Sequence, residues 1–237
     1  MSGHSHWATI KHKKEKEDSK RGQAFTKLIK EITVTAKTGG GDPGANPRLR
    51  LLIEKARDIN MPLDNINRAV KRGTGELPGV VYEPMTYEGY GPYGIAVVVD
   101  TLSDNKNRIV SELRHVFTGK GGNLGESGSV AWMFEKMGVV DVTGSISEDT
   151  LLEKLIDYDI KDVKHHGGSF SIFCDPKALE VIKKTLLEIP LKVEKAEVES
   201  VAKNAIHLPD EQAKKAYEFL ESLQDLDDVQ NVYTNLA

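Results

Sequence analysis

Three stretches near the start of the chain have the apolar spacing of amphipathic helices. In residues 22–38 apolar side chains recur every three or four positions, and glycines follow. A second stretch begins with Asn46, which can cap a helix, and Pro47, which suits a first helical position. Pro62 opens a third stretch, which Gly73 is expected to end. The side chains expected to face inward are Phe25, Leu28, Ile29, Ile32, Leu49, Leu52, Ile53, Ala56, Leu63, Ile66 and Val70.

The pattern then changes to the alternation of β-strands. Residues 80–90 and 95–101 flank the turn at 91–94, which predicts a hairpin. Ser103 or Asp104 can cap the helix that follows, whose inward positions run from Ile109 to Phe117. A glycine-rich loop comes next. The expected first unit of sheet therefore contains a hairpin and one covering helix.

The remaining elements repeat a strand-helix-strand order. They are strands at 129–134 and 139–142, a helix at 148–158, strands at 161–165 and 169–174, a helix from Asp175, a strand at 191–201, a helix beyond Pro209 and a strand at 229–233. From 139 to 201 the order is β-α-β-β-α-β, which predicts a ferredoxin-like unit. The last helix and strand can complete the hairpin unit, so the ferredoxin-like unit is expected to be an insertion.

These elements predict an α+β protein. A three-helix N-terminal domain is followed by two α+β, ferredoxin-like domains, the third inserted into the second. The expected divisions are a basic mobile arm at 1–21, a helical domain at 22–78, an α+β domain at 79–136 plus 203–237, and the inserted ferredoxin-like domain at 137–202.

Charge divides the chain unevenly. The 237 residues carry a formal charge of −4, but residues 1–75 hold 16 Lys and Arg against 8 Asp and Glu. The remainder holds 16 basic against 28 acidic residues. A basic module attached to an acidic body favours a polyanionic partner for the first quarter of the chain.

Basic side chains recur along this first quarter. Arg68 and Arg72 are one helical turn apart with Lys71 beside them, on the side away from the apolar positions. Such charges can coat a solvated surface, but a convergent cluster favours phosphate contact. The candidate cations are Lys11, His12, Lys13, Lys14, Lys20 and Arg21 on the arm, Lys27 and Lys30 on the first helix, Arg48 and Arg50 on the second, and Arg68, Lys71 and Arg72 on the third.

Trp7 lies among basic residues of the arm. From there its indole can stack on an exposed base or anchor the arm against the protein, and the sequence does not choose between them. His4, His6 and His12 offer imidazoles to a metal, but they lack a supporting Cys or carboxylate pattern. We therefore expect no metal site.

Other chemistries find little support. The loop at 119–128 lacks the Gly-Lys-Ser/Thr ending of a P-loop, so no nucleotide cofactor or small-molecule substrate is expected. We find no nucleophile with a partnered base and no acid/base pair of recognisable spacing, so we expect no enzyme. Cys174 is alone, and no apolar run approaches a membrane span. A cytoplasmic location without a membrane partner is expected.

Several stretches of this sequence are long and idiosyncratic. They are GHSHWATIKHKK (3–14), KRGQAFTKLIKEI (20–32), GGGDPGANPRLR (39–50), NMPLDNINRAVKRGTG (60–75), YEGYGP (87–92) and GGNLGESGSVAWMF (121–134). In these blocks the chain resembles the YebC/PmpR family, with His6 and Lys13 where relatives often have Lys and Arg. The resemblance implies three domains with the third inserted in the second, and nucleic-acid contacts at the matching basic positions.

The resemblance leaves two functions open. Bacterial members are described as probable transcriptional regulators that bind promoter DNA; the mitochondrial relatives activate translation of cytochrome oxidase subunits, and bacterial members are linked to ribosomes stalled on proline runs. We expect a non-enzymatic, DNA-binding regulator of gene expression. The alternative is a translation factor that binds ribosomal RNA or the ribosome, which the basic arm and glycine loops favour. A protein-binding adaptor is a more distant possibility.

Overall fold

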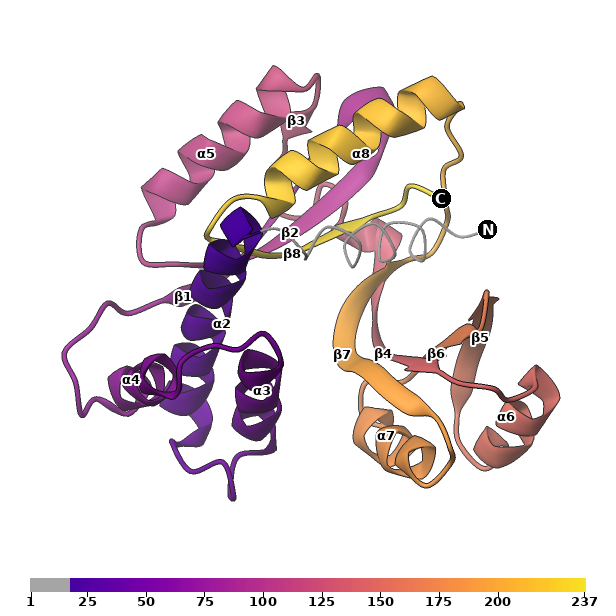
Figure 1. Ribbon diagram of the computed structural model, residues 1–237. Coiled ribbons are helices and arrows are strands. Elements are labelled where there is room, and N and C mark those ends of the chain that lie inside the picture. The colour runs from indigo at the N-terminus through magenta and orange to yellow at the C-terminus, as the bar shows by residue number, and fades with distance from the viewer. Residues whose placement is uncertain (1–17) are drawn as a thin grey trace.

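The computed structural model describes residues 18–237 and, from Arg21 onward, their side chains. The first unit contains the helices α2 (Asp18–Gly39), α3 (Pro47–Asp58) and α4 (Leu63–Thr74), with α2 packed against both of the others (Figure 1). Asn46 caps α3 by accepting a hydrogen bond from the Leu49 backbone N–H, and Pro47 occupies the first turn, as predicted. All four predicted inward positions of α3 are buried.

Two expectations for these helices are wrong. Leu63 lies at the open end of α4, where its side chain is 57% exposed rather than turned inward. Gly73 does not end α4, which runs to Thr74 and is closed by Gly75 in the left-handed conformation (φ 85°). Gly73 instead lies where α4 meets α2, because a β-carbon there would be 2.3 Å from the Thr33 carbonyl oxygen. Its lack of a side chain allows the two helices to approach.

The second unit is a four-stranded sheet with the order β3-β1-β2-β8. The hairpin is confirmed: β1 (Glu83–Tyr90) pairs antiparallel with β2 (Ala96–Ser103) around the short helix η1 (Pro92–Gly94). β8 (Val229–Thr234) pairs with β2, and β3 (Asn123–Leu124) with β1. The helices α5 (Lys106–Gly119) and α8 (Asp210–Gln224) cover one face, where Phe117 and Phe219 meet edge to face in the core (Figure 1).

Local signals misplaced two features of this unit. Asn105, rather than Ser103 or Asp104, caps α5 by accepting from the Arg108 backbone N–H. The expected strand at 129–134 is also wrong: Ala131–Met133 form a short helix, η2, and the next strand begins only at Phe134. Backbone N–H groups around η2 bond to a side chain of β1, as described below, instead of to a neighbouring strand.

The third unit has the predicted β-α-β-β-α-β order. Its elements are β4 (Phe134–Thr143), α6 (Glu148–Leu155), β5 (Ile160–His166), β6 (Ser169–Cys174), α7 (Leu179–Leu187) and β7 (Lys192–Ala202). The antiparallel sheet has the order β5-β6-β4-β7, the arrangement of a ferredoxin-like fold. Phe170, Ile172 and Cys174 alternate into its core as expected.

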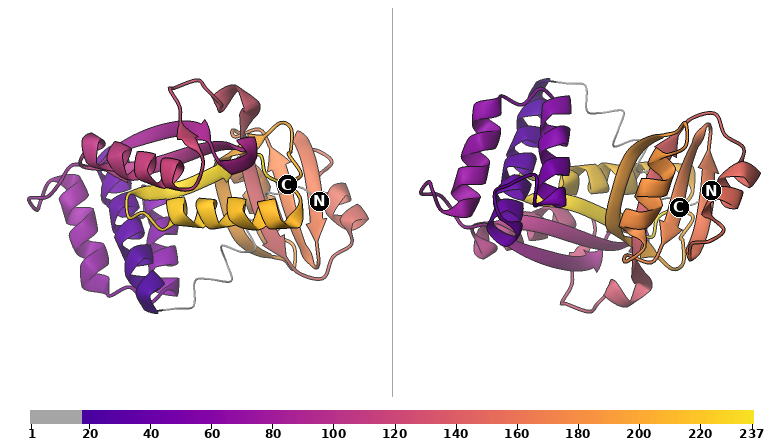
Figure 2. Two further views of the ribbon diagram at one scale, coloured as in Figure 1. Left: turned by 90° about the horizontal axis from the view of Figure 1, so that it is seen from above. Right: turned by 90° about the horizontal axis from the view of Figure 1, so that it is seen from below.

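The ferredoxin-like unit is inserted between the two parts of the second unit. The chain leaves the first sheet after η2 and returns through β7 to α8 and β8. Figure 2 shows the helical unit on one side of the molecule and the inserted unit on the other, with the first sheet and its helices spanning both. The fold class predicted from the sequence is therefore confirmed, including the insertion. Within residues 18–237 no helix has the length and apolar character needed to cross a membrane.

Candidate nucleic-acid interface

α4 presents three exposed cations. Arg68, Lys71 and Arg72 are all exposed, and we refer to these three residues as the α4 surface. Arg68 pairs with Asp64 one turn earlier at 2.7 Å, but both side chains are more than half exposed. Such a solvated pair contributes at most about 1 kcal/mol, so it does not prevent Arg68 from contacting a phosphate.

α3 presents its cations to a different part of the molecule. Arg48 and Arg50 are exposed and line a cleft of about 660 Å³ between α3, strands β1, β2 and β8 of the first sheet, and the inserted unit. Arg50 also donates a hydrogen bond to the Pro43 carbonyl oxygen at 3.3 Å. An ion pair between Lys55 of α3 and Glu197 of β7 connects the helical unit to the inserted unit.

The predicted cations of α3 and α4 therefore lie on two different surfaces. Figure 1 shows α3 on the side of α2 that faces the inserted unit and α4 on the other side. None of the three residues of the α4 surface lines the cleft. Helix packing decides this division, because α2 separates two helices whose charges the sequence alone places in one basic segment.

Four further cations in the cleft were not singled out from the sequence, and Lys55 of α3 is one of them. Lys136 of β4 and Lys183 and Lys184 of α7 line it together with Arg48 and Arg50. The inserted unit supplies these three lysines, although the chain beyond residue 75 has an excess of acidic residues. Carboxylates partly offset the positive charge of the cleft, and these are Glu31, Glu54, Asp100, Glu180 and Glu197.

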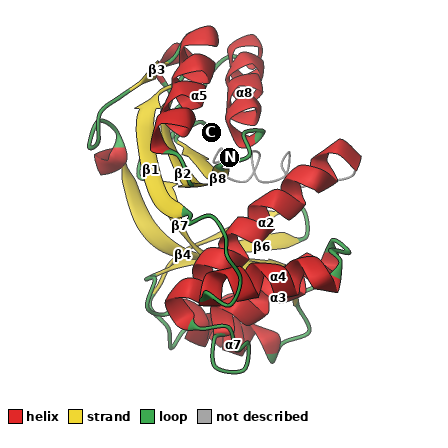
Figure 3. Ribbon diagram, turned by 90° about the vertical axis from the view of Figure 1, so that its left-hand side faces the viewer, coloured by secondary structure: helices red, strands yellow, loops and turns green. Residues whose placement is uncertain are grey.

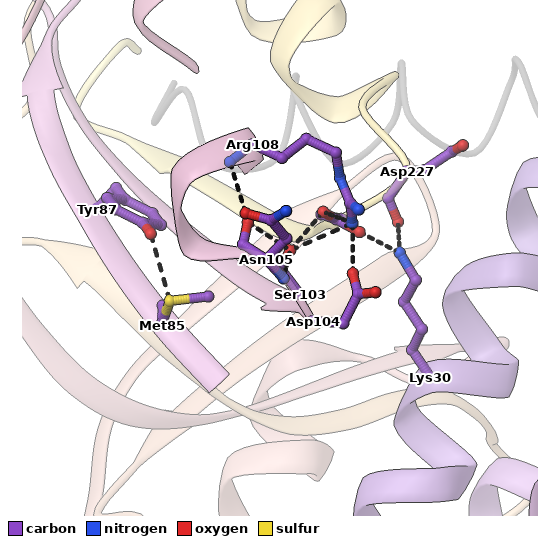
Figure 4. A network of polar contacts seen from close by, with 9 residues as sticks. Lys30, Met85, Tyr87, Ser103, Asp104, Asn105, Arg108 and Asp227 are labelled. Atoms are coloured by element: carbon purple, nitrogen blue, oxygen red, sulfur yellow. Dashed lines mark hydrogen bonds and ion pairs between the residues drawn. The ribbon is translucent and has the colours of Figure 1, made fainter. Parts of the chain in front are cut away.

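Lys30 does not belong to an exposed surface. It is 5% exposed, pairs with the carboxylate of Asp228, and donates to the Asp227 carbonyl oxygen at 2.8 Å (Figure 4). Lys27 likewise donates to the backbone carbonyl of Gln224. Both lysines connect α2 to the turn between α8 and β8. We therefore remove Lys30 from the nucleic-acid candidates, because its charge is already neutralised inside the protein.

Asp228 is the centre of this network. Its second carboxylate oxygen accepts from the Ser103 hydroxyl at 2.6 Å and from Arg108 at 2.8 Å (Figure 4). Burial alone raises the pKa of Asp228, but the hydrogen bonds from Lys30, Ser103 and Arg108 lower it below its usual value. The carboxylate therefore stays charged and ties α2, β2 and α5 together.

The remaining candidates lie at or beyond the start of the described chain. α2 begins at Asp18, so Lys20 and Arg21 belong to this helix and not to an arm preceding it. Arg21 is exposed, lies over the Phe25 ring and donates to the Ile59 carbonyl oxygen at 3.4 Å. The candidates outside the described residues are Trp7, Lys11, His12, Lys13 and Lys14.

The glycine-rich loop is folded back onto β1. The Gly125 N–H donates to the Glu88 backbone carbonyl at 2.8 Å, and the buried Glu88 carboxylate accepts three further backbone N–H groups from residues 128–131. The loop therefore encloses a protein carboxylate where a nucleotide-binding loop would hold a phosphate. From residue 18 onward, no three His, Cys, Asp or Glu side chains come together as a metal site.

The architecture defines a class of three-unit α+β proteins, with a helical N-terminal unit and a ferredoxin-like insertion. The chain belongs to the TACO1/YebC family. Residues 5–76 match the model of the "TACO1/YebC protein N-terminal domain", and residues 82–236 match that of the "TACO1/YebC second and third domain". The resemblance recognised in the sequence is thereby confirmed.

Relatives match this chain along its whole length. A protein of Chlorobaculum tepidum is 52% identical and one of Chlorobium luteolum 50% identical, each alignment covering 100% of this chain and 95% of the relative. Both are named as probable transcriptional regulatory proteins. The crystal structure of the conserved hypothetical protein Aq1575 from Aquifex aeolicus has a TM-score of 0.87 at 45% identity, covering 98% of this chain and 96% of that one.

Proposed function

We propose that this protein is a non-enzymatic regulator of gene expression that binds DNA through its helical unit. The observation that carries the proposal is the α4 surface, whose three cations are exposed on one short helix. Asn67 is exposed on the same helix beside Arg68, which adds a side chain able to bond base edges. The names of the relatives are consistent with a regulatory role.

The distribution of charge indicates which unit of the protein faces the nucleic acid. The basic first quarter attracts a polyanion, whereas the acidic remainder repels it, so the helical unit is expected to face the nucleic acid. Each cation that contacts a phosphate releases counterions, which makes the affinity depend on salt. The α4 surface alone offers three such contacts.

The test is a charge reversal in the full chain. Arg68→Glu, Lys71→Glu and Arg72→Glu are combined, and binding to labelled duplex DNA is measured by fluorescence anisotropy over a range of salt concentrations. We expect weaker binding. The slope of the logarithm of the binding constant against the logarithm of the salt concentration should become about three units less steep, since each lost phosphate contact lowers it by about one.

A matched control removes the same charge elsewhere. Lys106, Lys214 and Lys215 are exposed on α5 and α8, so their reversal to Glu changes the net charge equally without touching the α4 surface. Unchanged affinity in the α4 variant, with a native circular dichroism spectrum, would refute the proposal. Equal losses of affinity in both variants would show that binding depends on net charge and not on the α4 surface, which would also refute the proposal.

A second candidate function is a translation factor that binds ribosomal RNA. The observation in its favour is the division of the cations between α4 and the cleft, because a single helix in a major groove would use only one of these surfaces. Sedimentation of gently lysed cells separates the candidates. Migration with ribosomes that high salt abolishes would support this function, whereas DNase-sensitive association with the nucleoid would support the first.

A further inference from the structure

Two exposed aromatic side chains reach the same backbone carbonyl at the edge of the first sheet. Trp132 of η2 is 64% exposed and Tyr90 at the end of β1 is 37% exposed. The Trp132 indole N–H and the Tyr90 hydroxyl both donate to the same acceptor, the Ser129 carbonyl oxygen, at 3.2 and 3.3 Å. Figure 3 shows the short helix between β3 and β4 at the edge of the sheet, beside β1. We refer to these two side chains as the aromatic pair.

The segment that carries Trp132 is held firmly. Val130 and Phe134 on either side of it are buried against Ala96 and Val98 of β2. The backbone N–H groups of Gly128, Val130 and Ala131 donate hydrogen bonds of 2.7 to 2.9 Å to the buried carboxylate of Glu88. Trp132 is therefore an exposed ring on a fixed support.

The polar edges of the pair are already used inside the protein. With the indole N–H and the phenol bonded to Ser129, the rings offer mainly their apolar faces to a ligand. A cation lies next to them, because Lys203 is exposed and its ammonium group donates to the Trp132 carbonyl oxygen at 2.9 Å. A flat apolar ligand that carries a negative charge fits this combination.

The pair is too small for a protein partner. A Trp and a Tyr bury at most about 150–250 Å² each, so the exposed parts offer on the order of 200 Å², whereas a stable protein interface needs about 800 Å² per partner. The large aliphatic side chains exposed in the described chain belong to other segments, such as Leu152 of α6, Ile156 directly after it and Val181 of α7. The aromatic pair thus lacks the apolar surroundings of a protein interface.

We propose that Trp132 and Tyr90 form a stacking platform for an unpaired base of single-stranded RNA, with Lys203 contacting the adjacent phosphate. Aromatic faces bind bases only when these are unstacked, and RNA exposes such bases in its loops, bulges and ends, whereas the bases of duplex DNA are stacked and paired. The inference rests on the proposed function only in that the ligand is a nucleic acid, and it adds a second contact region far from α4 in the sequence.

The test uses the intrinsic fluorescence of the chain. The protein has two tryptophans, so the full-length Trp7→Phe variant leaves Trp132 as the sole reporter. A labelled single-stranded oligouridine and the same strand paired with oligoadenosine are titrated into it. Anisotropy of the label reports binding, and Trp132 fluorescence reports stacking. We expect the single strand to quench Trp132 and the duplex to bind without quenching.

Affinity provides the second measurement. Trp132→Ala is expected to weaken binding of the single strand about 5- to 150-fold, because a stacked base loses its aromatic partner. Trp132→Phe keeps an aromatic ring and is expected to retain most of the affinity. Ile156→Ala removes an exposed apolar side chain directly after α6 and serves as the control, with no expected change.

The outcomes separate the two proposals. Binding that appears in anisotropy without quenching, or that Trp132→Ala leaves unchanged, overturns the stacking platform while nucleic-acid binding stands. Equal quenching by duplex and single strand also overturns it, since paired bases cannot stack on the ring. If no nucleic acid binds, duplex DNA included, both proposals fail.

Discussion

Lys30 and Asp228 form a buried ion pair, although 198 positions separate them in the chain. The pair joins α2 of the helical unit to the residue that precedes β8 of the first sheet. The main-chain N–H of Leu102 donates to the Asp228 backbone carbonyl at 2.8 Å, so side chain and backbone of one aspartate bind neighbouring elements. The orientation of the helical unit therefore depends on charges that the protein has buried.

Removing the carboxylate should destabilise the protein strongly. In Asp228→Ala, Lys30 keeps its charge in a buried position without a carboxylate to neutralise it, which costs about 3–5 kcal/mol. Urea unfolding followed by circular dichroism measures this change. Asp227→Ala is the control, because Asp227 contacts Lys30 only through its backbone carbonyl and its side chain is exposed. A loss in the control similar to that of Asp228→Ala would contradict the assignment.

Stability should also fall in acid because of two carboxylates. The pKa values of Asp228 and Glu88 lie below their usual ones in the folded protein. A lowered folded pKa stabilises the protein above the unfolded value, about 4 for these groups. This stabilisation is lost as the pH falls through the folded pKa. We expect the urea midpoint to fall progressively below about pH 5. A smaller fall in Asp228→Ala is expected, and an identical pH profile would contradict the role of Asp228.

The support of η2 depends on the charge of Glu88. Burial alone raises the pKa of this carboxyl, but the backbone N–H groups of Gly128, Val130 and Ala131 lower it overall. Glu88→Gln replaces one carboxylate oxygen by an NH₂ group, which is a donor and cannot accept from the backbone N–H groups that face it. The unsatisfied N–H groups should lower the free energy of unfolding by about 1–3 kcal/mol. Glu83→Gln, at the exposed start of the same strand, should change stability by less than about 0.5 kcal/mol. Hydrogen exchange at residues 128–131 should rise only in Glu88→Gln.

The close approach of α2 and α4 predicts the effect of a single methyl group. Gly73→Ala places a β-carbon against the Thr33 carbonyl, so we expect a loss of about 1–3 kcal/mol in unfolding free energy. Gly22→Ala provides the opposite case, since a β-carbon at this position of α2 meets nothing within 4 Å. It should stabilise the protein by up to about 1 kcal/mol, because alanine favours a helix over glycine. Thermal unfolding of both variants measures these changes in stability. A Gly73→Ala protein as stable as the unsubstituted one would refute the packing explanation.

Local signals were enough for most of the fold. The cap at Asn46, the hairpin around residues 91–94 and the alternating strand at 169–174 each follow from spacing within a few residues, and all three are present. The element order also predicted the ferredoxin-like insertion, because this order admits few topologies. Local signals failed at 129–134, where backbone groups bind a carboxylate of another strand.

The sequence by itself determined the elements, their order, the fold class and the basic character of the first quarter of the chain. Only the tertiary structure decided which cations are available: Lys30 is neutralised by Asp228, while Arg48 and Arg50 turn to the cleft and the α4 surface to solvent. It also brought Tyr90 and Trp132 together. The physical reason is that periodicity reports contacts within one element, whereas burial and ion pairing depend on elements that are distant in the chain and meet only after packing.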